Sequence, residues 1–145
     1  MRNPGFLFSA ALIVASIACS SVAERHDRFV ESGEEAMAAG RTSEAIIAYR
    51  NAAQLDPLSV KARLGLAETL TKSGDARGAL EEYVRAADLK PDDLILQVNT
   101  GNLLLAVGKL DDARTRAESV LQKDPTHVEA HIHLGQRLVE ILISA

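Results

Sequence analysis

The sequence contains a single cysteine, no tryptophan and only 3% aromatic residues, although 47% of its 145 residues are hydrophobic. A lone cysteine excludes an internal disulfide. The hydrophobic residues are mostly alanine and leucine, which favour helices that pack closely through small side chains. The formal net charge is −4, so the basic surface typical of nucleic-acid-binding proteins is not expected.

Motifs that carry catalysis are missing as well. The sequence has no Gly-x-Ser-x-Gly turn, no glycine-rich phosphate loop and no His-Glu-x-x-His zinc pattern. His127 and His131 are one helical turn apart, whereas His133 lies roughly 200° further around the same helix, so the three cannot converge. These histidines indicate packing or surface roles, and a metal clip between His127 and His131 is the alternative. We therefore expect a protein that is not an enzyme and uses neither a metal ion nor a cofactor.

The first 18 residues differ in composition from the remainder. Arg2 is the only charged residue before Glu24, and residues 6–18 are apolar apart from Ser9 and Ser16. At about 1.5 Å per residue, this run is too short for a hydrocarbon core of about 30 Å. A short charged start, a short apolar run and a small-residue exit predict a secretory signal peptide over residues 1–18.

Cys19 lies where this segment ends, in the run Ser-Ile-Ala-Cys-Ser. The run resembles the lipobox of bacterial lipoproteins, except that Ser16 stands where leucine or valine is more usual. The resemblance implies cleavage before Cys19, acylation of that cysteine, a tether over residues 19–25 and a membrane-anchored protein facing the periplasm. Ser20 favours the outer membrane. The alternatives are cleavage by the ordinary signal peptidase after Ala18 or Ala23, and an uncleaved anchor.

Small residues and prolines recur every 34 residues over most of the chain. A fixed period of this length is typical of stacked repeats, in which one unit alone cannot bury its apolar face. The four series are Gly40, Gly74 and Gly108; Ala45, Ala79 and Ala113; Pro57, Pro91 and Pro125; and Gly33, Ala67, Gly101 and Gly135.

Each unit is predicted to be a pair of helices. In the second unit, the helices are expected over residues 59–73 and 75–89, separated by Gly74, which can take a positive φ without steric penalty. Asp75 suits the N-cap of the second helix. Pro91 ends the unit, and Asp92 and Asp93 open the next helix.

The period and these residues resemble the tetratricopeptide repeat. The resemblance implies an all-α, right-handed α-solenoid with full units over residues 26–59, 60–93 and 94–127. A partial fourth unit, or a C-terminal helix, follows over residues 128–145. It also implies that Tyr49 and Tyr83 fill the space between consecutive units.

In this family the first helix of each unit lines a concave groove that binds a protein partner. An amphipathic helix or an extended peptide would suit the groove, which is expected to be mixed at its N-terminal end and apolar in the third unit. Chaperone adaptors use lysine and asparagine there to clamp a C-terminal carboxylate, but the first unit has Val30 and Glu34, which argues against a clamp. The expected groove residues are Val30, Glu34 and Met37; Lys61, Leu64 and Glu68; and Ile95, Val98, Asn102 and Leu105.

The sequence therefore predicts a non-catalytic interaction scaffold in the bacterial cell envelope. It resembles periplasmic repeat lipoproteins that assist envelope assembly or exopolysaccharide export. Two alternatives remain. The apolar C-terminal residues 138–143 could mediate self-association into a structural oligomer, or the chain could be the N-terminal repeat part of a larger protein.

Overall fold

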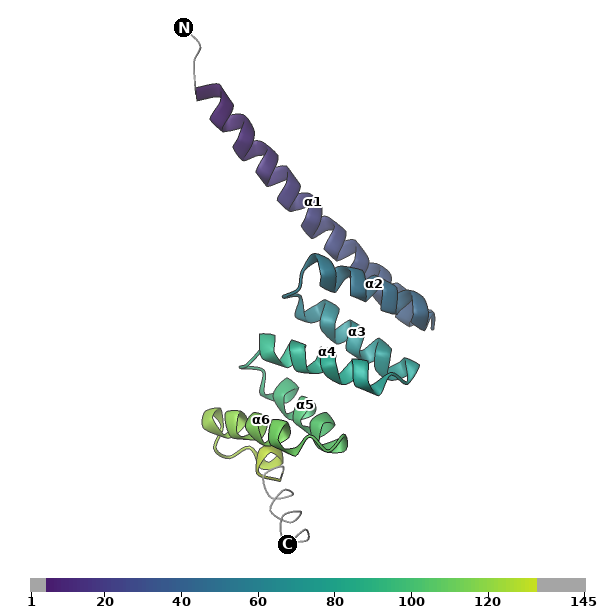
Figure 1. Ribbon diagram of the computed structural model, residues 1–145, viewed down its shortest axis with the longest axis vertical. Coiled ribbons are helices and arrows are strands. Elements are labelled where there is room, and N and C mark those ends of the chain that lie inside the picture. The colour runs from purple at the N-terminus through teal and green to yellow at the C-terminus, as the bar shows by residue number, and fades with distance from the viewer. Residues whose placement is uncertain (1–4, 133–145) are drawn as a thin grey trace. The chain divides into compact units, whose positions relative to one another are not determined.

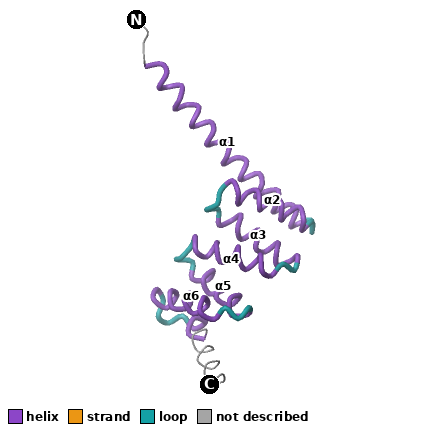
Figure 2. Tube along the Cα trace, in the orientation of Figure 1, coloured by secondary structure: helices purple, strands orange, loops and turns teal. Residues whose placement is uncertain are grey.

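The computed structural model describes the backbone of residues 5–132 and the side chains of residues 22–132. The predictions for Cys19, His133, Gly135 and the apolar C-terminal residues 138–143 lie outside the described side chains. Every regular element over residues 5–132 is helical, as Figure 2 shows, which confirms the predicted all-α class. Two compact units make up the chain, residues 1–74 (unit 1) and residues 75–145 (unit 2).

Unit 1 contains the helices α1 (Gly5–Ala38), α2 (Thr42–Leu55) and α3 (Val60–Ser73). The helix α2 packs along the C-terminal part of α1, and α3 contacts both α2 and α1 (Figure 1). Residues 19–25, which were expected to form a tether, are helical and belong to α1. Among the described residues, no helix combines the length and the hydropathy needed to cross a bilayer.

Unit 2 contains the helices α4 (Ala76–Leu89), α5 (Leu94–Ala106) and α6 (Leu110–Lys123), and residues 128–132 begin a further helical stretch. The helix α5 packs against both α4 and α6. One buried apolar cluster joins these three helices through Leu80, Leu104 and Ala113. A second cluster consists of Val98, Ala117, Val120 and Ala130.

The repeating glycines end helices, as predicted. Gly40, Gly74 and Gly108 have φ values of +72°, +85° and +76°. Only glycine adopts this left-handed backbone without a steric penalty, which explains why the residue type recurs at each of these turns. The N–H of Gly74 bonds to carbonyls of the last turn of α3, so it closes that helix.

Three of the helices begin at a side-chain cap. The side chains of Ser59, Asp75 and Asp93 accept a hydrogen bond from the backbone N–H three residues further on, at the starts of α3, α4 and α5. Each bond satisfies an N–H that has no partner inside its helix. The predicted helix boundaries in the second repeat and the capping role of Asp75 are confirmed.

Tyr49 of α2 lies between glycines of the two other helices of unit 1. Its side chain is 5% exposed. A Cβ atom added to Gly33 of α1 would lie 2.8 Å from the tyrosine ring, and one added to Gly65 of α3 would lie closer still. The ring therefore occupies the space that both glycines leave open. Tyr49 fills the gap between the first two repeats, as the family resemblance implied.

We predict that Gly65→Ala destabilises the protein by about 1–3 kcal/mol, because the added methyl group overpacks against the Tyr49 ring. The sign is informative, since glycine to alanine inside a helix otherwise gains about 1 kcal/mol. Urea denaturation followed by circular dichroism would measure the change. In a Tyr49→Leu background the same substitution should no longer destabilise, and an equal loss in both backgrounds would contradict this account.

Candidate partner-binding surfaces

The first helices of the two repeats in unit 1 are joined by an exposed ion pair. Glu34 Oε1 of α1 lies 2.8 Å from Lys61 Nζ of α3, with the side chains 49% and 65% exposed. The pKa of Lys61 is raised, chiefly by this hydrogen bond. Two of the predicted groove residues therefore do meet, on a surface that solvent reaches. We call this surface the α1–α3 face.

The α1–α3 face is predominantly acidic. Burial raises the pKa of the Tyr49 hydroxyl, the carboxylates of Glu34 and Glu68 raise it further, and Lys61 lowers it. Glu31 acts in the same way on Lys61, whose pKa its charge helps to raise. Three glutamates thus surround a single lysine and the tyrosine hydroxyl, so the face would repel an acidic ligand.

Two of the expected groove residues are part of the core. The side chains of Val30 and Val98 are 3% and 8% exposed, so a partner in the groove would not touch them. Val98 packs against Ala117, Val120 and Ala130, which accounts for its burial. The remaining expected residues are exposed or half-buried: Glu34, Met37, Lys61, Leu64, Glu68, Ile95, Asn102 and Leu105.

The exposed face of α5 is more polar than the sequence suggested. Leu96 and Leu104 are buried, and they account for part of the apolar excess in this helix. Ile95 is 73% exposed and Leu103 is 38% exposed. Asn99 and Asn102 are exposed between them on the helix, so the expected continuous apolar strip is replaced by a mixed surface.

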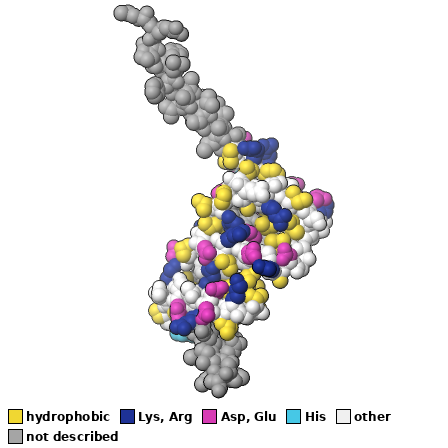
Figure 3. Space-filling model, in the orientation of Figure 1, with side chains coloured by type: hydrophobic (Ala, Val, Ile, Leu, Met, Phe, Trp, Pro, Cys, Tyr) yellow, Lys and Arg dark blue, Asp and Glu magenta, His cyan; other side chains and the backbone are white. Residues whose placement is uncertain are grey.

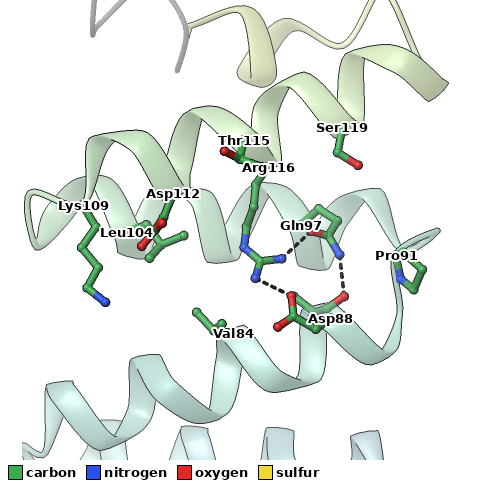
Figure 4. Close-up of a pocket in the computed structure, with 11 residues that line it drawn as sticks. Val84, Asp88, Pro91, Gln97, Leu104, Lys109, Asp112, Thr115, Arg116 and Ser119 are labelled. Carbon is green, nitrogen blue, oxygen red and sulfur yellow. Dashed lines mark hydrogen bonds and ion pairs between the residues drawn. The ribbon is translucent and has the colours of Figure 1, made fainter.

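A cleft of about 460 Å³ lies entirely within unit 2. In Figure 4, α4 and α6 form its two walls and α5 lies behind them as its floor. The lining combines apolar side chains at the floor with polar side chains from both walls. It consists of Val84, Ala87, Asp88, Pro91, Gln97, Leu104, Lys109, Asp112, Thr115, Arg116 and Ser119.

A polar network spans this cleft. Arg116 of α6 donates to Gln97 Oε1 of α5 at 2.7 Å and to Asp88 Oδ1 of α4 at 2.8 Å, as the dashed lines in Figure 4 show. Gln97 is only 4% exposed, and its Nε2 donates to the carbonyl oxygens of Ala87 and Lys90 at 2.6 and 3.2 Å. Because each partner is already paired, the network holds α4, α5 and α6 together and is not an open ligand site.

Gln97 belongs to a 34-residue series that the sequence analysis missed. Arg63 Nε donates to the carbonyl of Pro57 at 2.9 Å, and His131 Nε2 lies 2.8 Å from the carbonyl of Pro125. Residues 63, 97 and 131 thus share one position of the repeat and one task, which is to bond the turn before their own helix. A nitrogen donor at this interval was a signal present in the sequence.

The histidines have structural surroundings. Since Pro125 O can only accept, the bond to His131 requires a proton on Nε2, and this leaves that nitrogen unable to bind a metal ion. His127 Nδ1 lies 3.3 Å from Glu129 Oε2, close enough for an ion pair when the histidine is protonated, without hydrogen-bond geometry. No group of three potential metal ligands occurs among the described residues.

Comparisons with known proteins agree with the fold. Two tetratricopeptide repeat family models match residues 36–99 and 98–138. Residues 36–138 are tetratricopeptide repeats. The first helix of each repeat corresponds to α1, α3 and α5, and the second to α2, α4 and α6.

Relatives with curated descriptions share these repeats. The human DnaJ homolog subfamily C member 3 is 29% identical over 103 residues, which are 71% of this chain and 20% of that protein. The Protein CTR9 homolog of Arabidopsis thaliana is 32% identical over 108 residues, 74% of this chain and 10% of that protein. The chain thus spans a fifth or less of the length of these relatives.

Solved structures show the same fold at low identity. The MamA protein has a TM-score of 0.67 at 18% identity, with 82% of this chain and 65% of that chain covered. The first repeat domain of Spaghetti (RPAP3), bound to the HSP90 peptide SRMEEVD, has a TM-score of 0.59 at 21% identity, with 84% and 95% covered. Tetratricopeptide repeats of this kind are protein-interaction modules.

We predict that Arg116→Met destabilises the repeats by about 1–3 kcal/mol, because it leaves the buried oxygen of Gln97 without its donor. Arg114→Met is the matched control on the same helix. Arg114 pairs only with Glu118 one turn away, at 52% exposure, so its loss should change stability by less than about 0.5 kcal/mol. Urea denaturation of both variants would measure the difference, and equal effects would rule out a structural role for the network.

We predict that Tyr49 titrates above its ordinary pKa of 10.0, because burial and the charges of Glu34 and Glu68 disfavour its anion. A Tyr83→Phe variant leaves Tyr49 as the only tyrosine, so tyrosinate absorbance reports on it alone. The raised pKa means that the contribution of Tyr49 to stability is complete below about pH 10 and is lost as the pH rises through its folded-state value.

In that background, Glu34→Gln should lower the midpoint, since it removes a raising charge and releases Lys61. Glu44→Gln is the control, because Glu44 pairs with Arg41 and is not among the groups that shift Tyr49. A midpoint at or below the ordinary value would contradict the predicted environment of the hydroxyl.

Proposed function

We propose that this protein is a non-catalytic scaffold in the bacterial cell envelope, anchored by acylation of Cys19, which binds a protein partner on the first helices of its repeats. The observation that carries the proposal is the exposed α1–α3 face, where Glu34, Lys61 and Glu68 project from helices held apart by Tyr49. Similar repeat domains have been solved with bound peptides.

The partner is expected to differ in charge from those peptides. The peptide bound to the RPAP3 domain, SRMEEVD, is rich in carboxylates. Here Val30 is buried and Glu34 is acidic, so neither supplies the cation that a carboxylate clamp needs. A basic or neutral segment, either extended or an amphipathic helix, suits the α1–α3 face better.

The envelope location rests on the N-terminal sequence. A short apolar run that ends in Ala-Cys-Ser resembles a lipoprotein processing site, and Cys19 is the sole cysteine. A chain carrying several acyl groups would stay on the membrane, since two hydrophobic anchors hold far better than one. The resemblance to exopolysaccharide-associated repeat lipoproteins favours a role in the assembly or export of an envelope component.

Site-specific photo-crosslinking in a Gram-negative host would test both parts. A benzoylphenylalanine replaces Glu68 or Asn102 on first helices, and Arg50 or Arg114 on second helices serves as an equally exposed control. We expect a crosslinked protein adduct from the first-helix positions alone. In the Cys19→Ser variant, the acyl-sized mass and the membrane fractionation should be lost.

The two arms separate the two claims. Adducts from the Arg50 and Arg114 positions alone would overturn the assigned binding face, whatever the location of the protein. Unchanged intact mass and unchanged fractionation after Cys19→Ser would overturn the lipid anchor, whatever the partner.

A further inference from the structure

A second hollow in unit 2 has a composition unlike that of the α1–α3 face. It has a volume of about 640 Å³ and lies on one side of α4 beside the turn between α5 and α6. We call it the α4 pocket. Its lining consists of Ala76, Arg77, Leu80, Glu81, Val84, Arg85, Val107 and Lys109. Val84 and Lys109, both labelled in Figure 4, also line the cleft described above, so the two hollows adjoin.

The floor of the α4 pocket is apolar. Leu80 is 8% exposed and packs in a cluster with Leu104 and Ala113, and Val84 packs against the same cluster. Val107, at the end of α5, is 51% exposed. Covering such a side chain removes apolar surface from water, which favours an apolar group in the pocket.

The rim of the pocket is cationic. Three cations, Arg77, Arg85 and Lys109, stand against one carboxylate, Glu81, in a chain whose net charge is −4. Arg77 is 92% exposed and only 3.6 Å from Glu81 Oε1, so this ion pair is loose. The Lys109 ammonium has no hydrogen bond or ion pair among residues 22–132. Figure 3 shows acidic and basic side chains interspersed over the drawn face, which makes a local excess of one sign distinctive.

From this combination we infer that the α4 pocket binds a segment of a partner protein in which an apolar side chain is flanked by carboxylates. The apolar side chain covers Leu80, Val84 and Val107, while the carboxylates lie near Lys109 and the two arginines. Charge complementarity selects the occupant, because the same segment would be repelled by the glutamates of the α1–α3 face. The pocket therefore serves a different ligand from the first-helix surface.

Fluorescence anisotropy with the full-length protein would test the inference. The probe is a labelled peptide with two adjacent leucines between pairs of glutamates. We expect saturable binding that Lys109→Glu weakens by about fivefold or more, since it replaces an attraction with a repulsion. Val107→Ser should also weaken it. Two control peptides, with glutamine in place of glutamate and with alanine in place of leucine, should each bind less well.

Lys90→Glu is the matched control, because it makes the same change of charge at an exposed residue of unit 2 outside the pocket. It should leave the affinity within about twofold. Glu68→Lys, on the α1–α3 face, should also have little effect, so a failed pocket and a failed first-helix surface would be distinguishable. Circular dichroism would confirm that each variant is folded.

Several results would overturn the inference. These are the absence of saturable binding, equal weakening by Lys90→Glu and Lys109→Glu, and equal affinity for the glutamine peptide. Sedimentation velocity adds another, because a dimer of the free protein that Lys109→Glu dissociates would make the pocket a contact between copies of this chain.

Discussion

Close approach between neighbouring helices, which only small side chains allow, is the constraint on which this structure depends. With so few aromatic residues, the chain cannot fill wide gaps between helices, and alanines take the crossing positions: Ala45, Ala52 and Ala113 are fully buried. The one large ring in the core of unit 1, Tyr49, fits because Gly33 and Gly65 lack a Cβ on either side of it. The spacing of α1 and α3, and hence the contact between Glu34 and Lys61, follows from that fit.

The features that could be predicted from the sequence are local ones. Gly74 ends a helix and Asp75 begins the next because a positive φ and an N-cap bond involve residues no more than a few positions apart. The 34-residue interval then carries these local rules along the chain. This is why the helix boundaries in the second repeat and the packing of Tyr49 could be predicted from one sequence.

The remaining features depend on contacts between residues distant in sequence. Arg116 reaches Asp88, 28 residues away, and nothing local distinguishes it from the exposed Arg114 on the same helix. Val98 occupies a position that faces the groove in the family, yet side chains from α6 and from Ala130 cover it. Gly65 escaped notice for a similar reason: only the position of the Tyr49 ring makes its missing side chain necessary.

The two candidate surfaces show how one repeat architecture can carry separate specificities. Packing and capping use the small residues, the caps and the buried nitrogen donors, and these recur with the period. Glu31, Glu34, Glu68, Arg77 and Lys109 are exposed and contribute little to the core, so substitution there changes charge at small cost in stability. An acidic face on α1 and α3 and a cationic rim on α4 can therefore coexist in one chain, each selecting partners of opposite sign. Binding specificity in such repeats follows from the residues that break the period, and the fold follows from those that keep it.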